Sequence, residues 1–271
     1  MLIQIPSEEE VWNTIKNKNS DSVAGPDGFT TTFFLSPKLD VLDAVIDFFE
    51  GSSYPKFFAT TNIVLIPKKD IVNNWNNFRP ISLCSFFNKL ISKIIASRLV
   101  DILPRIVSVN QTGFVKGKSI FDNVLLAQEI IHDINAKVNG GNIIFKLDIT
   151  KAYDNLNWDF LYNVLSFFGF NQAFIKLVKN SIENCYFSGI INGGNHGFFK
   201  SSQGLIQGDP LSPALFIIAM DYLSRGLEEL YKRHTTLLYH TLGGMPVTHL
   251  SFADDFIIFS NGSIRNVKIL F

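Results

Sequence analysis

The chain has 271 residues, of which 46% are apolar, 18% charged and 13% aromatic, and its 24 basic side chains balance 24 acidic ones. This composition excludes a disordered, collagen-like or highly charged protein, and the length allows one large domain or two small ones around a real core. The neutral balance argues against a nucleic-acid binder, because a phosphate backbone attracts Lys and Arg.

The charge, however, is segregated along the chain. Residues 1–55 carry three bases and nine acids, a net of −6, whereas residues 56–118 carry ten bases and two acids, a net of +8. Residues 119–271 carry 11 bases and 13 acids, a net of −2. A +8 block creates a local positive field whatever the total is, although a merely solvated surface explains it equally well until the acidic sites are placed.

Several classes of protein are excluded by what the sequence lacks. Its longest apolar run, residues 214–220, is too short to span a bilayer, and the N-terminus has neither a basic nor an apolar signal region. Cys84 and Cys185 are far apart and outside any CxxC pattern, which favours buried thiols in a reducing compartment over a zinc site. The compartment itself stays open.

The first half of the chain is predicted to be mainly helical. Apolar spacing predicts helices over residues 8–18, 39–50, 86–103 and 119–134, with Pro104 closing the third. Residues 60–66 are β-branched and apolar, which predicts a strand.

The second half mixes strands and helices. We expect a strand over 143–149, a helix over about 157–168 and another helix within 209–230. Residues 248–253 and 256–260 read as two strands of a tight hairpin with Asp254 and Asp255 between them, and 264–271 as an element just beginning. Because the elements do not alternate regularly, the predicted class is α+β.

Acidic residues at strand ends carry the chemistry. Asp254 and Asp255 repel each other at the hairpin tip unless a cation or solvent relieves them, and Asp148 ends an otherwise apolar strand. If the strands are neighbours, these acids could share two divalent ions about 4 Å apart, as in-line phosphoryl transfer requires. Mg²⁺ fits such oxygen ligands best, whereas an ordinary Asp-rich turn is the alternative.

A third element, residues 201–213, contains Gly204 and Gly208, which allow close backbone approach, before Asp209 and Pro210 begin a helix. In chain order these elements resemble the reverse transcriptase of non-LTR (LINE-type) retrotransposons, most closely the plant ones. The matching segments are 25–29 (GPDGF), 63–69 (IVLIPKK), 78–83 (FRPISL), 110–114 (NQTGF), 147–154 (LDITKAYD), 207–213 (QGDPLSP) and 252–255 (FADD).

The resemblance implies a right-hand polymerase fold and an RNA-directed DNA polymerase activity. It implies an N-terminal helical extension over 1–55, fingers over 56–135 and a palm with a ferredoxin-like sheet over 136–271, with the thumb missing because the chain stops sixteen residues after Asp255. The implied partners are an RNA template with a DNA primer and dNTPs, without a membrane. The family is expected in the nucleus, the cytoplasm or both, and the oligomeric state stays open.

The resemblance also implies a role for each matching residue. Asp148 and Asp254 are the expected ligands of two Mg²⁺ ions, with Mn²⁺ as an alternative, helped by Asp255 and the carbonyl of Ile149. The expected nucleotide-binding residues are Lys68 (or its neighbour Lys69), Arg79, the sugar gate Tyr153 and Gln207, and the expected template and primer residues are Gly208, Asp209 and Pro210.

Two departures leave alternatives open. Gln203 and Ile206 stand where the family usually has arginines, which favours a decayed copy that is catalytically inactive and at most binds nucleic acid. A group II intron maturase is a further alternative. A non-polymerase metal phosphohydrolase explains the acids, but neither residues 207–210 nor the basic block.

Overall fold

A computed structural model describes residues 1–18, 24–35, 38–52, 55–56, 58–244 and 246–271 of the chain. The chain divides into two compact units: unit 1 comprises Met1–Leu99 and Tyr153–Pro213, and unit 2 comprises Val100–Ala152 and Ala214–Phe271. Each unit is built from two separate stretches of sequence, so pairing between distant segments completes both.

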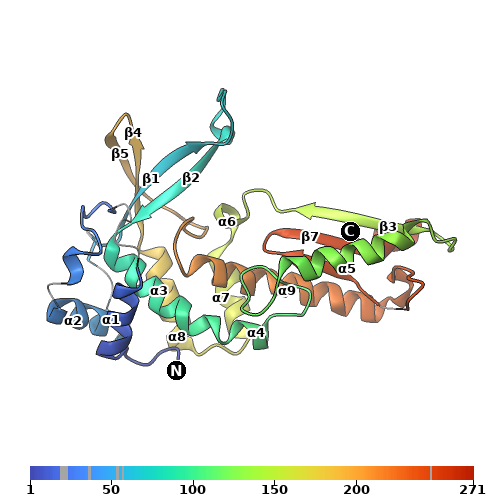
Figure 1. Ribbon diagram of the computed structural model, residues 1–271, viewed down its shortest axis with the longest axis horizontal. Coiled ribbons are helices and arrows are strands. Elements are labelled where there is room, and N and C mark those ends of the chain that lie inside the picture. The colour runs from blue at the N-terminus through green and yellow to red at the C-terminus, as the bar shows by residue number, and fades with distance from the viewer. Residues whose placement is uncertain (19–23, 36–37, 53–54, 57, 245) are drawn as a thin grey trace. The chain divides into compact units, whose positions relative to one another are not determined.

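Helices and strands alternate irregularly along the described residues (Figure 1). The α-helices are α1 (Glu8–Lys16), α2 (Lys38–Phe49), α3 (Phe86–Val100), α4 (Leu103–Ile106), α5 (Ile120–His132), α6 (Ala152–Asn155), α7 (Trp158–Phe167), α8 (Gln172–Glu183), α9 (Ser212–Arg233) and α10 (Ile264–Leu270). Short 3₁₀ turns are η1 (Phe33–Leu35), η2 (Trp75–Asn77), η3 (Asp133–Asn135) and η4 (Thr235–Leu237). The strands are β1 (Thr60–Pro67), β2 (Phe78–Cys84), β3 (Asn142–Asp148), β4 (Tyr186–Ile191), β5 (Gly194–Lys200), β6 (His249–Phe252) and β7 (Asp255–Asn261).

Local signals explain where several helices begin. The Ser7 side chain accepts a hydrogen bond from the N–H of Glu10 at 3.2 Å, and three acids fill the first turn of α1, where the helix dipole favours negative charge. Ser119 caps α5 in the same way, accepting from the N–H of Phe121 at 3.2 Å. The predicted helices over 8–18 and 119–134 are therefore confirmed within two residues at each end.

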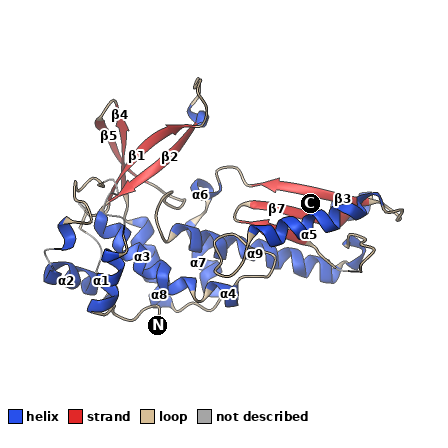
Figure 2. Ribbon diagram, in the orientation of Figure 1, coloured by secondary structure: helices blue, strands red, loops and turns tan. Residues whose placement is uncertain are grey.

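The four strands of unit 1 form one sheet in the order β2-β1-β4-β5 (Figure 2). β1 pairs antiparallel with β2 and parallel with β4, while β4 and β5 form an antiparallel hairpin. One face of this sheet packs on a buried cluster that includes Cys84, Cys185, Phe187 and Ile206. Both cysteines are free and buried, and burial raises the pKa of the Cys185 thiol to about 12, so the expectation of buried thiols is confirmed.

Helix α3 supplies much of the unit 1 core. Its apolar side chains, Leu90, Ile91, Ile94, Ile95 and Leu99 among them, are fully buried. The expectation that Pro104 closes this helix is wrong, because α3 already ends at Val100. Pro104 lies instead in the first turn of α4, where its missing N–H costs no hydrogen bond.

Arg98 on α3 ties down the N-terminal segment. Its guanidinium forms two hydrogen bonds of 2.7 Å with the carboxylate of Glu10 and donates to the carbonyls of Leu2 and Gln4 at 3.2 and 2.6 Å. It also lies 5.1 Å from the ring centre of Phe49. A forked donor can satisfy all these acceptors at once, which Lys cannot.

Unit 2 contains a three-stranded antiparallel sheet in the order β3-β7-β6. One face packs against Ala127 and Ile130 of α5, and the other packs against Leu227 and Tyr231 of α9. Because both faces are covered, β3 and β7 are nearly continuous apolar runs rather than alternating ones.

The predicted α+β class is confirmed, whereas the sequence pattern does not predict β2, α8 or the β4–β5 hairpin. The predicted hairpin is displaced by one residue, since the connection is Ala253–Asp254 and Asp255 already belongs to β7. No helix in the described ranges has the length and apolar character needed to cross a membrane.

Candidate active site

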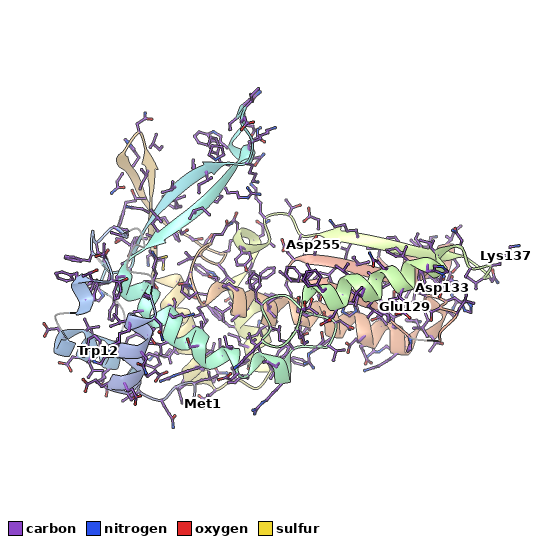
Figure 3. The ribbon with its side chains drawn as sticks, in the orientation of Figure 1. Met1, Trp12, Glu129, Asp133, Lys137 and Asp255 are labelled. Atoms are coloured by element: carbon purple, nitrogen blue, oxygen red, sulfur yellow. The ribbon has the colours of Figure 1, made fainter. Side chains whose placement is uncertain are left out.

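Three Asp residues lie at one end of the unit 2 sheet. Asp148 is the last residue of β3 and lies opposite Asp255, the first residue of β7, while Asp254 is in the connection between β6 and β7. Figure 3 labels Asp255 at this end of the sheet. Residues that face each other on antiparallel strands share one face, with Cβ atoms about 4.5–5.5 Å apart. Asp148 and Asp255 are both exposed to solvent.

Like charges at this separation repel, and Lys146 relieves part of the repulsion. Its Nζ lies 3.5 Å from Oδ1 of Asp255, two residues before Asp148 on the same face of β3. Both partners are more than half exposed, so the pair contributes little to stability. The Lys146–Asp255 pair matters because it places a positive charge beside carboxylates that otherwise have no compensating charge.

The donor set at this sheet end suits a hard divalent cation. Among the described residues no three His, Cys, Asp or Glu side chains converge as a preformed metal site. Mg²⁺ does not require one, because it binds through one or two carboxylates and completes its shell with water and substrate phosphates. The Ile149 side chain packs into the apolar core, so this residue can offer only its main-chain carbonyl.

The turn that carries Asp254 is strained. Ala253 has φ 54°, in the left-handed region that costs a non-glycine residue about 1–2 kcal/mol. A positive φ is typical of the two-residue turns that match the twist of a hairpin. A contact elsewhere must therefore hold Ala253 in this conformation.

Gln111 supplies that contact. Its side chain is fully buried, its Oε1 accepts from the N–H of Ala253 at 2.9 Å, and its Nε2 donates to the carbonyl of Ala253 at 3.3 Å. The same Oε1 accepts from the N–H of Gly113 at 2.8 Å. The side-chain amide of Gln111 is thus hydrogen-bonded to both the N–H and the carbonyl of Ala253, the residue that precedes Asp254.

The segment around Gln111 runs beside β6 like an additional strand. Gln111 bridges Ser251 in parallel, and the N–H of Thr112 donates to the carbonyl of Ser251 at 3.1 Å. Asn123 of α5 donates to the same carbonyl at 3.0 Å. Gly113 approaches so closely that an added Cβ would lie 2.5 Å from the nitrogen of Ala253.

In unit 1, the loop before α9 lies against β2 and α6. The carbonyl of Gln207 accepts from the N–H of Ser82 at 3.1 Å, and its Nε2 donates to Oδ1 of Asp154 at 2.9 Å. Gly204 has φ 89° and lies so near Asp154 that an added Cβ would be 2.8 Å from its carbonyl oxygen. Gly208 has φ 97°, a backbone conformation that side chains other than glycine rarely adopt.

Asp209 is buried beneath this loop. Its Oδ2 accepts from the N–H groups of Leu211 and Ser212 at 2.9 and 3.2 Å, which fixes the start of α9. Burial raises the pKa of its carboxyl, and hydrogen bonds from Ser92, Leu211 and Ser212 oppose the rise. The side chain shapes the turn that Pro210 continues, and it points into the protein rather than to solvent.

A cavity of about 240 Å³ in unit 1 adjoins the same loop. Its walls include Trp158, Phe187, Phe199 and Gln207. The indole N–H of Trp158 donates to the carbonyl of Gly204 at 2.7 Å, which fixes one wall.

Residues 66–270 match the family described as reverse transcriptase (RNA-dependent DNA polymerase). The chain belongs to the reverse transcriptase family.

Two relatives of this reverse transcriptase chain come from transposable elements. The Transposon TX1 uncharacterized 149 kDa protein of Xenopus laevis is 30% identical over 92% of the chain. The Pol polyprotein of the type-2 retrotransposable element R2DM of Drosophila melanogaster is 27% identical over 94% of it. The chain spans 19% and 24% of the length of these two relatives. The predicted resemblance to a non-LTR retrotransposon reverse transcriptase is confirmed.

Solved structures share the fold. An apo telomerase from Candida tropicalis, truncated from its C-terminal domain, is similar with a TM-score of 0.54 over 89% of this chain and 51% of that one. The same organism's telomerase in complex with a fragment of telomeric RNA gives the same TM-score over 42% of its chain. At 15% identity these likenesses concern the fold alone, and they support the predicted polymerase architecture.

The remaining predicted residues of this reverse transcriptase lie in unit 1. Lys68 and Arg79 are exposed on the β1–β2 hairpin, where Lys68 Nζ donates to the carbonyl of Asn76 at 3.0 Å. Lys69 is also exposed, so the choice between the two lysines stays a prediction. Tyr153 is in α6, and its carbonyl accepts from the N–H of Leu205 at 2.8 Å.

Sequence reasoning missed the roles of Gln111 and Lys146. The family resemblance includes the segment 110–114 but implies no function for it. The usable signal in the sequence is Gly113, two positions after Gln111, because a glycine can indicate close backbone approach. The burial of the Gln111 amide becomes visible only in the structure.

Proposed function

We propose that this chain is the polymerase core of an RNA-directed DNA polymerase, which transfers nucleotides from dNTPs onto the 3′ end of a primer on an RNA template. The supporting observation is the facing pair Asp148 and Asp255 with Asp254 in a turn gripped by Gln111. The whole relatives are much longer than this chain, so its partners and substrates are part of the proposal.

In the proposed mechanism, Asp148 and Asp254 hold two divalent ions, Mg²⁺ or alternatively Mn²⁺, with help from Asp255 and the Ile149 carbonyl. When bound, these ions lower the pKa of the primer hydroxyl and neutralise charge on the phosphates.

The unit 1 residues position the nucleotide and the template. Lys68 and Arg79 neutralise the triphosphate and the leaving pyrophosphate. The Tyr153 ring lies under the sugar and excludes a 2′-hydroxyl, while Gln207 contacts the nucleotide. Gly208 allows the template to approach the backbone, and Asp209 and Pro210 keep this turn in shape.

A second candidate function, nucleic-acid binding without catalysis, rests on Gln203 and Ile206. Gln203 is exposed, so an arginine there could reach a phosphate. Ile206 is only 7% exposed and belongs to the apolar cluster with Phe187, so Ile206→Arg would bury a cation in the core. Only Gln203→Arg is therefore a sensible repair.

Primer extension on poly(rA)/oligo(dT) with Mg²⁺ tests the proposal. We expect extension by the chain, and a loss of at least about 100-fold in Asp254→Asn and in Asp148→Asn. Asp101→Asn is the matched control, since Asp101 is an exposed acid of unit 2 that pairs with Lys116 at 2.9 Å. Full activity in Asp254→Asn would overturn the assignment.

If the chain extends no primer, the Gln203→Arg variant decides between the candidates. Activity that appears in Gln203→Arg and disappears again with Asp254→Asn supports a catalytic centre weakened at the template path. RNA binding without extension in either protein supports the second candidate.

A further inference from the structure

Lys146 and Asp148 are the two charged residues of strand β3, and the alternation of side chains along the strand places both on one face of the unit 2 sheet. The first part of that face is apolar, since Ile144 packs with Phe259 of β7 and with residues of α5. The face becomes polar at Lys146, which is exposed, and it ends at the facing pair Asp148 and Asp255. The lysine therefore lies between the part of the sheet that α5 covers and the carboxylates at its end.

The ammonium group of Lys146 contacts one aspartate of the facing pair. Its Nζ lies 3.5 Å from Oδ1 of Asp255, and the contact crosses the two strands diagonally, because Ile257 is the residue directly opposite Lys146. In the part of the chain that the structure describes, no other basic side chain forms an ion pair with Asp148, Asp254 or Asp255. Lys146 is therefore the counter-charge of this sheet end.

A lysine and a divalent cation compete for the same carboxylate oxygen. A cation bound to Oδ1 of Asp255 would lie within about 6 Å of Nζ, because Mg²⁺ binds oxygen at about 2.1 Å and the ion pair measures 3.5 Å. At this distance the repulsion between a single and a double positive charge weakens binding by about 3- to 10-fold in an exposed site at about 0.1 M salt.

We propose that Lys146 sets the affinity of this sheet end for divalent cations, because its ammonium group competes with the cation for Asp255. The inference rests on the proposed function, which takes these aspartates as the metal ligands. In the free chain the lysine keeps cation binding weak, and the phosphates of a nucleotide, which bring further ligands and negative charge, complete it. Lys146 acts through Asp255 and is not itself a catalytic residue.

A simpler role for the ion pair is to hold β3 against β7 as a cross-strand contact. That role predicts a small loss in the free energy of unfolding when Lys146 is replaced, as is usual for exposed pairs, and an unchanged affinity for the cation. The affinity for the cation therefore distinguishes the two roles.

Mn²⁺ binding to the chain without nucleotide, primer or template tests the proposal, with the electron paramagnetic resonance signal of free Mn²⁺ as the readout. Lys146→Met removes the charge at similar side-chain length, and its Kd for Mn²⁺ should fall by about 3- to 10-fold. Lys146→Glu reverses the charge and should lower the Kd further. Lys146→Arg keeps the charge and should bind Mn²⁺ like the parent chain.

Lys137 provides the matched controls. It is an exposed lysine of the same unit that precedes β3, whereas Asp255 faces the last residue of that strand (Figure 3). The 7 residues of β3 span about 20 Å, which is about two Debye lengths at 0.1 M salt. Lys137→Met and Lys137→Glu should therefore bind Mn²⁺ like the parent chain. Urea unfolding of each variant establishes that the chain still folds.

Asp148→Asn and Asp254→Asn separate this proposal from the proposed function. Loss of Mn²⁺ binding in these two variants, with tighter binding in Lys146→Met, supports the proposal whether or not the chain extends a primer. Binding that the two Asn variants lose but that is no tighter in Lys146→Met refutes the role of Lys146 alone. A parent chain without saturable Mn²⁺ binding, or with binding that neither Asn variant changes, would overturn the metal assignment and this proposal with it.

Discussion

Replacing Gln111 by Met is the sharpest test of how the hairpin that carries Asp254 is held. Met has nearly the volume of Gln, so the substitution removes hydrogen bonds without leaving a large cavity. The variant loses the contacts of 2.9 and 3.3 Å to the N–H and carbonyl of Ala253 and the contact of 2.8 Å to the N–H of Gly113.

The expected loss of stability follows from these contacts. Two buried N–H groups are left without their acceptor, at about 1–3 kcal/mol each, so the free energy of unfolding should fall by about 2–6 kcal/mol. The Ala253 turn can avoid its positive φ and gain about 1–2 kcal/mol by relaxing, which limits the loss and moves Asp254. We therefore expect a folded protein with a displaced carboxylate.

Two measurements distinguish this from general destabilisation. In primer extension, kcat should fall by about 100-fold, as expected when the Asp254 carboxylate is displaced by about 1 Å. The Mg²⁺ concentration that gives half-maximal activity should also rise. KM for dNTP should change little. Tyr239→Phe is the control, because it removes one buried hydrogen bond of unit 2, from its hydroxyl to the carbonyl of Ile130 at 3.2 Å.

An unchanged Mg²⁺ dependence in Gln111→Met, or an equal change in Tyr239→Phe, would refute the reasoning. Urea unfolding gives a result even if the chain has no polymerase activity. Equal midpoints for Gln111→Met and the parent chain would show that the amide does not hold the turn.

Two further predictions follow from backbone contact and from burial, and a third tests the sugar gate. Gly113→Ala should lower the free energy of unfolding by about 1–3 kcal/mol, because the new Cβ meets the nitrogen of Ala253. Burial lowers the pKa of His249 from 6.5 to about 4, so urea midpoints should fall as pH drops from 6.5 toward 4. The loss is at most about 3 kcal/mol and should vanish in His249→Gln. In an active chain, Tyr153→Ala should admit ribonucleotides, measured as incorporation of rNTP against dNTP.

Each of these has a clear contrary result. An unchanged urea midpoint in Gly113→Ala would mean that the backbone near Ala253 shifts to admit the new Cβ without a loss of stability. An unchanged pH slope in His249→Gln would assign the acid sensitivity to other groups. Unchanged sugar selectivity in Tyr153→Ala would remove that residue from the nucleotide site.

The sequence predicts the unit 2 sheet well, because its strands are apolar runs buried on both faces and their ends carry acids. The position of Asp148 at the end of β3 and of the hairpin that carries Asp254 could be read from that pattern alone. The one-residue error at Asp255 has a local cause: Asp favours turns, whereas here the pairing with Asp148 draws it into β7.

The β4–β5 hairpin could not be predicted in the same way. Its residues include four glycines, Gly189, Gly193, Gly194 and Gly197, which weaken any strand signal. Its partner β1 is far away in sequence, so only the tertiary fold supplies the pairing. For the same reason sequence reasoning interpreted Ile206 as a lost cation, although the fold makes it part of the core.

The +8 block illustrates how structure changes the meaning of a charge count. The Arg98 guanidinium pairs with the carboxylate of Glu10 and donates to two carbonyls. Lys118 donates to the carbonyls of Ser108 and Gln111 at 2.6 and 2.9 Å. The charge that a polyanion meets is therefore smaller than +8, and affinity must depend more on stacking.

That redistribution links the neutral total charge to the salt dependence that we expect when this chain binds an unpaired RNA strand. A chain that neutralises few phosphates has a shallow dependence of affinity on salt, at about 0.7 in slope for each single-strand phosphate. Most of its affinity for an unpaired strand must then come from contacts that salt does not screen, such as a base stacked on an exposed ring. Phe198, which is 61% exposed, is one such ring. The salt slope should consequently respond to Lys200→Ala, and the affinity at high salt to Phe198→Ala. If both variants instead changed the slope alone, the neutral chain would be binding RNA by charge only, and the exposed ring would have no part in it.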